Sequence, residues 1–331
     1  MSTLNLSWPA RLRLPARDEL PALTARTARA LIIPLIGLLV FLFAWHIAAR
    51  NIDTSLGQFP GPVQVYEQSV NLIAEHKRER DKETAFIERQ EKRNAEKLAK
   101  NPAAEVRIRD YTGKPTFFDQ IVTSLVTVMA GFVLASLLAI PLGILIGLNS
   151  TLHAALNPLV QLFKPVSPLA WLPLVTMVVS AVYVSDDPLF AKSFLTSLIT
   201  VSLCCLWPTL INTAVGVSGI SQDLKNVSKV LRLPFLTHVL KIAIPASLPA
   251  MFTGLRLSLG IAWMVLIAAE MLAQNPGLGK FVWDEFQNGS SDSLGRIMVA
   301  VLVIGMIGFL LDRAMLALQK AISWDKNAVV R

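Results

Sequence analysis

The chain has 331 residues, of which 53% are hydrophobic, and its mean hydropathy is +0.52. A soluble domain could not bury that much apolar surface, so the composition excludes an ordinary soluble protein and indicates a polytopic membrane protein. The formal charge of +8 could suggest nucleic-acid binding, but most of the excess lies in the N-terminal arm and in predicted cytoplasmic loops.

Residues 1–29 form a basic arm with five arginines against two acidic residues. Basic flanks stay in the cytoplasm, so the first membrane span, residues 30–49, runs from inside to outside. This apolar run is too long for a typical signal peptide and lacks a clear small-residue cleavage site. We therefore expect it to remain in the membrane.

Residues 50–117 form an insertion that the direction of the first span places outside the cytoplasm. It starts with a Pro-Gly-Pro turn, and residues 64–100 are then dominated by charges, with Glu88–Lys92 and Glu96–Lys100 in the favourable i,i+4 order. The pattern predicts one or two solvent-facing helices with little apolar stripe. Two interpretations stay open: a solvated hairpin without a partner, or a contact surface for a substrate-delivering protein or a neighbouring subunit.

Five further apolar runs predict membrane helices, at about 119–148, 155–184, 192–217, 243–273 and 295–319. Prolines 165, 168 and 173 interrupt the second of these five runs. The sequence thus predicts an all-α membrane protein of six transmembrane helices with a charged helical extracytoplasmic insertion.

Because each of the six spans reverses the direction of the chain, both termini are predicted to lie in the cytoplasm. The C-terminal tail is residues 323–331. The same count places the basic loop 218–242 inside and the short loop with Asp186 and Asp187 outside. The charge asymmetry therefore agrees with the span count. In this interpretation the membrane core covers residues 118–322.

The loop 218–242 contains an amphipathic pattern. Val227, Val230, Leu231 and Phe235 recur at helical spacing, and the basic side chains occupy other faces. Such a helix could dock in a groove on a partner protein or lie in the lipid interface, and periodicity alone does not separate the two.

Several stretches resemble the permease subunits of ABC importers, in the branch that serves nitrate, nitrite, cyanate, bicarbonate, taurine and alkanesulfonates. NVSKVLRLPFLTHVLKIAIP (226–245) is similar to the cytoplasmic coupling loop of the family, whose pattern is E-A-A-x3-G-x9-I-x-L-P. The likeness is also carried by FPGPVQVYEQSV (59–70), KPVSPLAWLPLV (164–175), LCCLWPTLINTAVGV (203–217) and PASLPAMFTGLRLSLGIAWMVLIAAEML (245–272). The GIAWMVLIAAEML run and FVWDEF (281–286) resemble the nitrate-type permeases most.

In that family the coupling loop forms a short helix that docks on the ATPase subunit. The resemblance therefore implies ATPase-coupling roles for Asn226, Val227, Ser228, Val230, Leu231, Arg232, Phe235, Ile242 and Pro245. The chain departs from the pattern where residues 226–228 replace E-A-A and where Arg232 replaces the usual glycine. Ile242 and Pro245 are retained, and would fix the exit into the fifth span.

The resemblance implies a type I ABC importer permease fold in the bacterial inner (plasma) membrane. It also implies a dimer, normally a homodimer, with two cytoplasmic ATPase subunits and a periplasmic or lipid-anchored substrate-binding protein. The cargo would be a small oxyanion, nitrate or nitrite first, with bicarbonate, cyanate, taurine or an alkanesulfonate as alternatives. ATP and Mg²⁺ would belong to the ATPase, and we expect no cofactor in this chain.

An ion-coupled secondary carrier is the alternative from another class. Such carriers usually show internal repeats and about twice as many spans. We see no repeat in this sequence, and six spans are few.

Two ionisable residues in the fifth span, Arg256 and Glu270, are candidates for the translocation pathway, because charge within a bilayer is costly. They lie about 21 Å apart on roughly the same helix face as Gly260 and Trp263, which we expect to face a cavity or a neighbouring subunit. Arg256 could attract a small anion, or could donate to carbonyls freed by nearby prolines. Glu270 would repel an anion, so it is predicted to be a structural or gating partner.

The other pathway candidates are aromatic or neutral. Trp171, Trp207 and Trp263 could close a narrow pore, or could simply pack. Asn212 and Thr213 in the fourth span could offer hydrogen bonds to the cargo. The proline-rich stretch 165–173 could form a wall of the pathway, because prolines break the backbone ladder.

No catalytic or metal site is predicted, so we expect a transport subunit without its own ATPase motif. The sequence contains no G-x4-G-K-[ST]. The histidines show no metal-ligand spacing; they are His46, His76, His153 and His238. The adjacent Cys204 and Cys205 are predicted to be small buried hydrophobes.

Overall fold

The computed structural model describes residues 20–54, 57–101, 106, 108–184, 189–290 and 292–322, with side chains from residue 32 onward. Most of the predicted cytoplasmic arm (1–19), the tail 323–331, and the predicted outer-loop residues Asp186 and Asp187 lie outside the described residues. The chain divides into two compact units, Met1–Gln64 and Val65–Arg331.

The first unit contains α1 (Leu20–Arg50) and a small hairpin of β1 (Asp53–Thr54) and β2 (Gly57–Gln58). The two strands are antiparallel, with Asp53 opposite Gln58 and Thr54 opposite Gly57. The indole of Trp45 donates to the carbonyl of Pro60 at 3.1 Å, which ties the end of α1 to the chain beyond the hairpin. Most of the described apolar side chains of α1, from residue 32 onward, are exposed, as expected for a helix surrounded by lipid.

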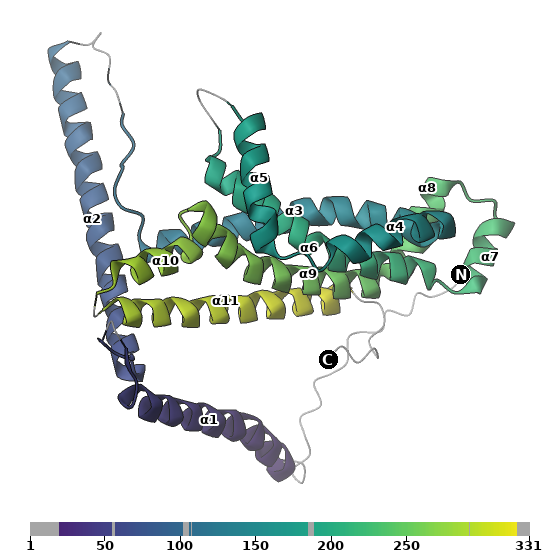
Figure 1. Cartoon of the computed structure of the whole chain (residues 1–331), viewed down its shortest axis with the longest axis horizontal. Coiled ribbons are helices and arrows are strands. Elements are labelled where there is room, and N and C mark those ends of the chain that lie inside the picture. The colour runs from purple at the N-terminus through teal and green to yellow at the C-terminus, as the bar shows by residue number, and fades with distance from the viewer. Residues whose placement is uncertain are drawn as a thin grey trace, which may run out of the picture. The chain divides into compact units, whose positions relative to one another are not determined.

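The secondary structure that the second unit shows in its described residues is all helical (Figure 1). Its long helices are α2 (Pro62–Lys100), α3 (Phe117–Leu148), α6 (Lys192–Ser218), α9 (Ile244–Ala273) and α11 (Ser293–Ile322). The shorter helices are α4 (Ser150–Phe163), α5 (Pro168–Val182), α7 (Gln222–Val230), α8 (Phe235–His238) and α10 (Leu278–Asn288), and a π-helical turn, Val239–Ala243, leads into α9.

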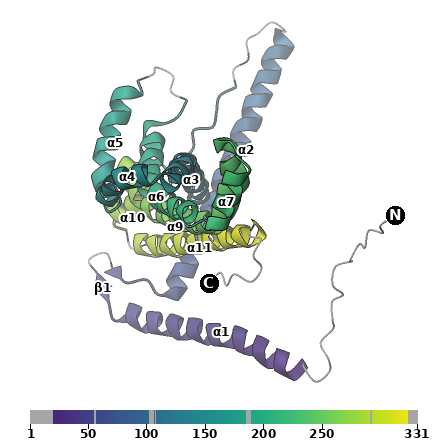
Figure 2. The same cartoon turned by 90° about the vertical axis from the view of Figure 1, so that its right-hand side faces the viewer.

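Helices α3, α6 and α9 form the centre of the bundle. Seen end-on in Figure 2, α4 and α5 lie on one side of this centre and α11 on the other. Small residues allow the close approach of α3 and α6: a Cβ added to Gly143 would lie 2.7 Å from the Cβ of Thr213, and one added to Gly147 would lie 2.7 Å from the Cβ of Val217. Such contacts are typical of helices packed within a membrane.

Five described helical segments are long and apolar enough to cross a membrane, and the bent pair α4–α5 supplies a sixth if it counts as one span. They coincide with the six predicted spans. The 155–184 run is interrupted as its prolines predict, because α4 and α5 meet there at an angle of 100°.

The bend follows from the proline positions. Pro165 and Pro168 lack the N–H group that continues a helix, and Ser167, directly before Pro168, is extended with φ −63° and ψ 141°. The side chain of Ser167 then caps α5 by accepting from the N–H of Leu169 at 3.3 Å. Pro173 lies inside α5, so the expectation that it also interrupts the span is wrong.

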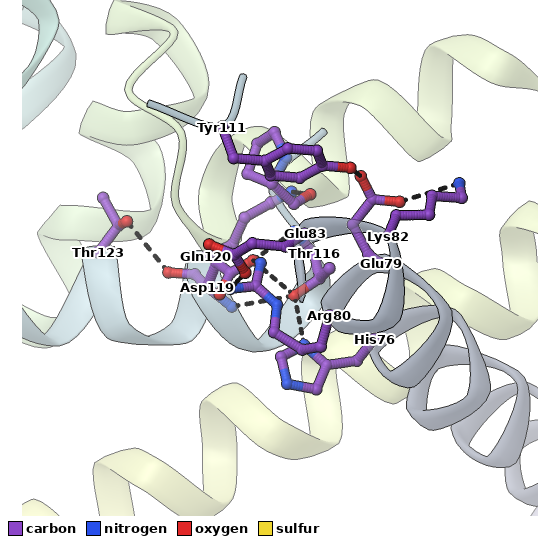
Figure 3. A network of polar contacts seen from close by, with 11 residues as sticks. His76, Glu79, Arg80, Lys82, Glu83, Tyr111, Thr116, Asp119, Gln120 and Thr123 are labelled. Carbon is purple, nitrogen blue, oxygen red and sulfur yellow. Dashed lines mark hydrogen bonds and ion pairs between the residues drawn. The ribbon is translucent and has the colours of Figure 1, made fainter. Parts of the chain in front are cut away.

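The charged part of the insertion forms one continuous helix, α2, which is attached to the start of α3. Figure 3 shows side chains of α2 meeting Thr116 and Asp119. Thr116 and Asp119 form a capping box on α3, and Arg80 donates to the Asp119 carboxylate at 3.1 Å. His76 lies 2.8 Å from the Thr116 hydroxyl.

The chain returning from α2 is also tied to it. The Tyr111 hydroxyl donates to Glu79 at 2.7 Å, and this bond with the neighbouring Lys82 holds the pKa of the Glu79 carboxyl below its ordinary value. The same bond raises the pKa of the Tyr111 phenol, because ionisation would place two negative charges side by side. Gln90 pairs with both backbone groups of Arg109, donating to its carbonyl at 2.8 Å and accepting from its N–H at 2.6 Å.

A second attachment joins α2 to the turn between α10 and α11. Arg296 forms ion pairs with Glu75 of α2 and with Glu285 of α10, the latter at 3.0 Å. Gln68 donates to Asp292 at 3.0 Å. The part of α2 between Gln68 and Arg80 therefore contacts both the start of α3 and the junction of α10 and α11.

Candidate functional site: the coupling segment and the α9 face

The segment between α6 and α9 is ordered and displays apolar side chains. Helices α7 and α8 lie at the end of the bundle remote from α10 (Figure 1). Val230 is 81% exposed and Phe235 60% exposed, and three further apolar side chains beside them are exposed as well: Val227, Leu231 and Leu236. Exposed apolar side chains on so short a segment suit either a groove on a partner protein or the lipid interface.

The opposite side of the segment holds it together. Ser228 is buried and its hydroxyl lies 2.8 Å from Nδ1 of His238, which joins α7 to α8. Ile242 packs against a buried cluster that includes Val217 and Ala243. Pro245 is the second residue of α9, directly after the π-helical turn Val239–Ala243. Asn226, in the middle of α7, is exposed.

Helix α7 ends in a Schellman turn at Arg232. The N–H of Leu233 donates to the carbonyl of Ser228 and the N–H of Arg232 donates to that of Lys229, both at 3.1 Å. This geometry places Arg232 in the left-handed region, with φ 47°. The family pattern has glycine there, and the structure supplies the reason, since glycine adopts this conformation without steric cost.

We therefore expect Arg232→Gly to leave the thermal stability of the purified permease unchanged or raised by up to about 1 kcal/mol. Arg232→Val should instead lower it by about 1–2 kcal/mol, because a β-branched side chain is strongly disfavoured at positive φ. Melting curves of the two variants in the same detergent measure the difference. Equal melting temperatures would contradict the assigned turn.

Arg256 has a carboxylate partner that the sequence analysis did not include. Its Nε donates to Oδ1 of Asp312 on α11 at 2.5 Å, and an Nη donates to Oδ2 at 3.1 Å. The side chains are 25% and 35% exposed, and both line an open pocket of about 840 Å³ on the face of α9 that also carries Leu257, Gly260 and Met264.

Trp263 and Glu270 do not share that open face, so the expectation that the whole stripe meets a cavity or another subunit is wrong for these two. The Trp263 indole is buried and donates to the carbonyl of Ile304 on α11 at 2.9 Å. Glu270 is fully buried, and accepts from the Ser124 hydroxyl at 2.7 Å and the Gly279 N–H at 3.0 Å. The chain's own α3, α10 and α11 cover this part of α9.

The neutral candidates on α6 have local partners. Asn212 donates to the carbonyl of Pro208 at 2.8 Å, and Thr213 is buried against Gly143 of α3. Phe163, at the α4–α5 bend, stacks on Trp207 with ring centres 6.4 Å apart and contacts Trp171 at 6.0 Å. The bend therefore brings both tryptophans into one aromatic cluster, and their role as a gate stays a prediction.

The residues that sequence reasoning missed are Asp312 and its neighbour Arg313, which donates to Asp312 at 2.9 Å. The signal was present, because two adjacent charges in the last apolar run are as unusual as those in the fifth span. Their partnership with Arg256 joins residues far apart in the sequence and is not readable from periodicity.

Three comparisons relate this chain to known proteins. A family described as "Binding-protein-dependent transport system inner membrane component" matches residues 139–324. The nitrate import permease protein of Leptolyngbya laminosa is 32% identical over 313 residues, 94% of each chain, and the bicarbonate transport system permease protein of Synechococcus elongatus is 34% identical over 291 residues, 88% of each. The MetNI methionine ABC transporter, solved in inward-facing conformations, shares the fold with a TM-score of 0.52 at 13% identity, over 62% of this chain and 96% of that one.

Proposed function

Because this chain belongs to the binding-protein-dependent transport system inner membrane component family, we propose that it carries a small planar oxyanion through the membrane, nitrate in the first place. As a permease subunit of an ABC importer it has an ATPase and a substrate-binding protein as partners.

The observation that carries the cargo assignment is the pair of relatives that match along nearly the whole chain. One is named for nitrate and the other for bicarbonate. Both anions are flat, have three oxygens around a central atom and carry one negative charge. A pathway shaped for either would therefore suit the other in size, charge and planar shape.

We infer that the exposed face of α7 and α8 receives the ATPase in the cytoplasm, and that the α10 end with α2 faces outward toward the binding protein. Exposed apolar knobs on a short helix suit a groove on a partner. In this scheme two copies of the chain form a homodimer, ATP and Mg²⁺ bind to the ATPase, and closure of the ATPase pair moves α7–α8 and opens the bundle outward.

Bicarbonate is the second candidate cargo. The bicarbonate relative is slightly more identical to this chain than the nitrate relative, 34% against 32%, although over a shorter alignment. The flat shape common to both anions favours either over a tetrahedral sulfonate.

Uptake by the complete transporter tests the assignment. With the ATPase and the binding protein in liposomes, we expect ATP-dependent accumulation of isotope-labelled nitrate. Excess unlabelled nitrate should compete strongly, bicarbonate less and taurine not at all. Strong competition by taurine, with no accumulation of nitrate, would contradict a planar cargo.

A further inference from the structure

The ion pair between Arg256 and Asp312 joins two long helices, at positions well inside both ends of each. Each residue is at least ten positions from either end of its helix, which corresponds to about 15 Å or more along the axis. Charges at this depth are rare, and in general mark a pathway or a site. The pocket at the pair lies on the face of α9 turned away from the α3–α6 core, where Met264 is 69% exposed.

Asp312 has two cationic partners and not one. Arg256 contacts both carboxylate oxygens, and Arg313 donates to Oδ2 at 2.9 Å while its guanidinium lies over the ring of Phe309. Two guanidinium groups and one carboxylate leave a single positive charge in this cluster. One monovalent anion would neutralise it.

The surroundings add no competing charge. Of the ten described residues that line the pocket, Arg256 and Asp312 are charged and the others are apolar or neutral. Thr253 and Gln319 supply the neutral polar groups. An anion entering here would therefore meet one guanidinium fork and no second carboxylate on the lining.

The contact geometry indicates the shape of the anion. A guanidinium holds a carboxylate through two parallel hydrogen bonds because both groups are flat and their spacing matches. Nitrate and bicarbonate present the same flat pair of oxygens. Asp312 thus occupies on Arg256 the position that two oxygens of a planar oxyanion would take.

We propose that Arg256 is a transient anion-binding residue in the pathway and that Asp312 is its internal competitor, displaced toward Arg313 when the anion arrives. This inference rests on the proposed function. Because Arg313 keeps Asp312 paired, the exchange leaves no unpartnered charge at membrane depth.

A competitor also solves the problem of release. A lone arginine in a site of low polarity would hold a monoanion too strongly for rapid transport, and efficient passage requires binding that is weak enough to leave. The returning carboxylate of Asp312 shortens the time that the anion stays on Arg256. It also covers Arg256 when the pathway is empty.

The test compares two variants of the permease in its complex with the ATPase and the binding protein. The double variant Arg256→Gln/Asp312→Asn keeps similar shapes and a neutral hydrogen bond. It should assemble in wild-type yield and take up nitrate at least tenfold more slowly. Nitrate binding should raise the melting temperature of the permease. In the single variant Asp312→Asn, this rise should be half complete at a nitrate concentration at least tenfold lower than in the wild type. Transport of nitrate by this variant should be slower than by the wild type.

The control is the double variant Lys280→Gln/Asp284→Asn, which neutralises an exposed pair on α10 and should leave the nitrate-induced melting shift as in the wild type. Wild-type uptake by Arg256→Gln/Asp312→Asn, or loss of its assembly, would show that the pair is structural and overturn the inference. An unchanged half-saturation in Asp312→Asn would do the same. If the wild type carries bicarbonate and not nitrate, only the cargo assignment fails, and the same measurements with bicarbonate decide the site.

Discussion

Phe235→Asp is expected to separate the permease from its ATPase without unfolding it. The Phe235 side chain is 60% exposed, so a charge there costs the isolated permease little. In a complex, the change removes a buried aromatic ring and desolvates a carboxylate, which together weaken binding by about 3 kcal/mol or more, roughly a hundredfold. Co-purification of the ATPase with tagged permease, compared at equal permease yield, measures the loss.

Phe286→Asp provides a matched control. Phe286 is 59% exposed, but lies on α10, at the other end of the bundle. The same substitution there should leave the amount of co-purified ATPase unchanged. If both variants, or neither, lost the ATPase, the α7–α8 face would not be its docking surface.

Glu270→Ala is expected to destabilise the junction of α9 and α10. The Glu270 carboxylate accepts from Ser124 of α3 and from the N–H of Gly279, and Ser124 in turn accepts from the N–H of Leu278 at 2.8 Å. Removing this acceptor leaves buried donors unpaired, which costs about 1–3 kcal/mol for each. We expect a loss of about 3 kcal/mol or more, seen as a lower melting temperature and a lower yield of folded permease.

Two variants sharpen this prediction. Glu270→Gln keeps an acceptor in the same place, so its melting temperature should lie between those of the wild type and Glu270→Ala. Asp284→Ala removes a nearby carboxylate that pairs with Lys280 on the surface, and should cost less than about 1 kcal/mol. A Glu270→Ala protein as stable as Asp284→Ala would refute the structural role of Glu270.

Hydropathy was sufficient to locate the membrane helices. The apolar runs have the length that a bilayer requires, and the structure places helices at all six. No glycine or proline interrupts residues 63–100, and the structure accordingly has one helix there. The 100° bend was harder to predict, because prolines mark where a helix can break but the surrounding packing determines the angle.

The candidate site was less predictable than the fold, because partners across helices leave no periodic signal. The coupling segment could be proposed from local spacing, since Val227, Val230 and Phe235 all lie within ten residues. The pairing of Arg256 with Asp312 joins residues 56 positions apart. Likewise, the helical period placed Glu270 on the stripe of Arg256, but the short helix α10 folds back over that end and buries it.

The central claim is that the α7–α8 face lies in the cytoplasm and meets the ATPase there. A single cysteine introduced as Val230→Cys, in a background with Cys204→Ala and Cys205→Ala, tests it with a membrane-impermeant maleimide. We expect labelling in inside-out vesicles, protection there when the ATPase is bound, and no labelling of intact cells. Labelling of intact cells would place this face outside the cytoplasm and exclude it as the docking surface for the ATPase.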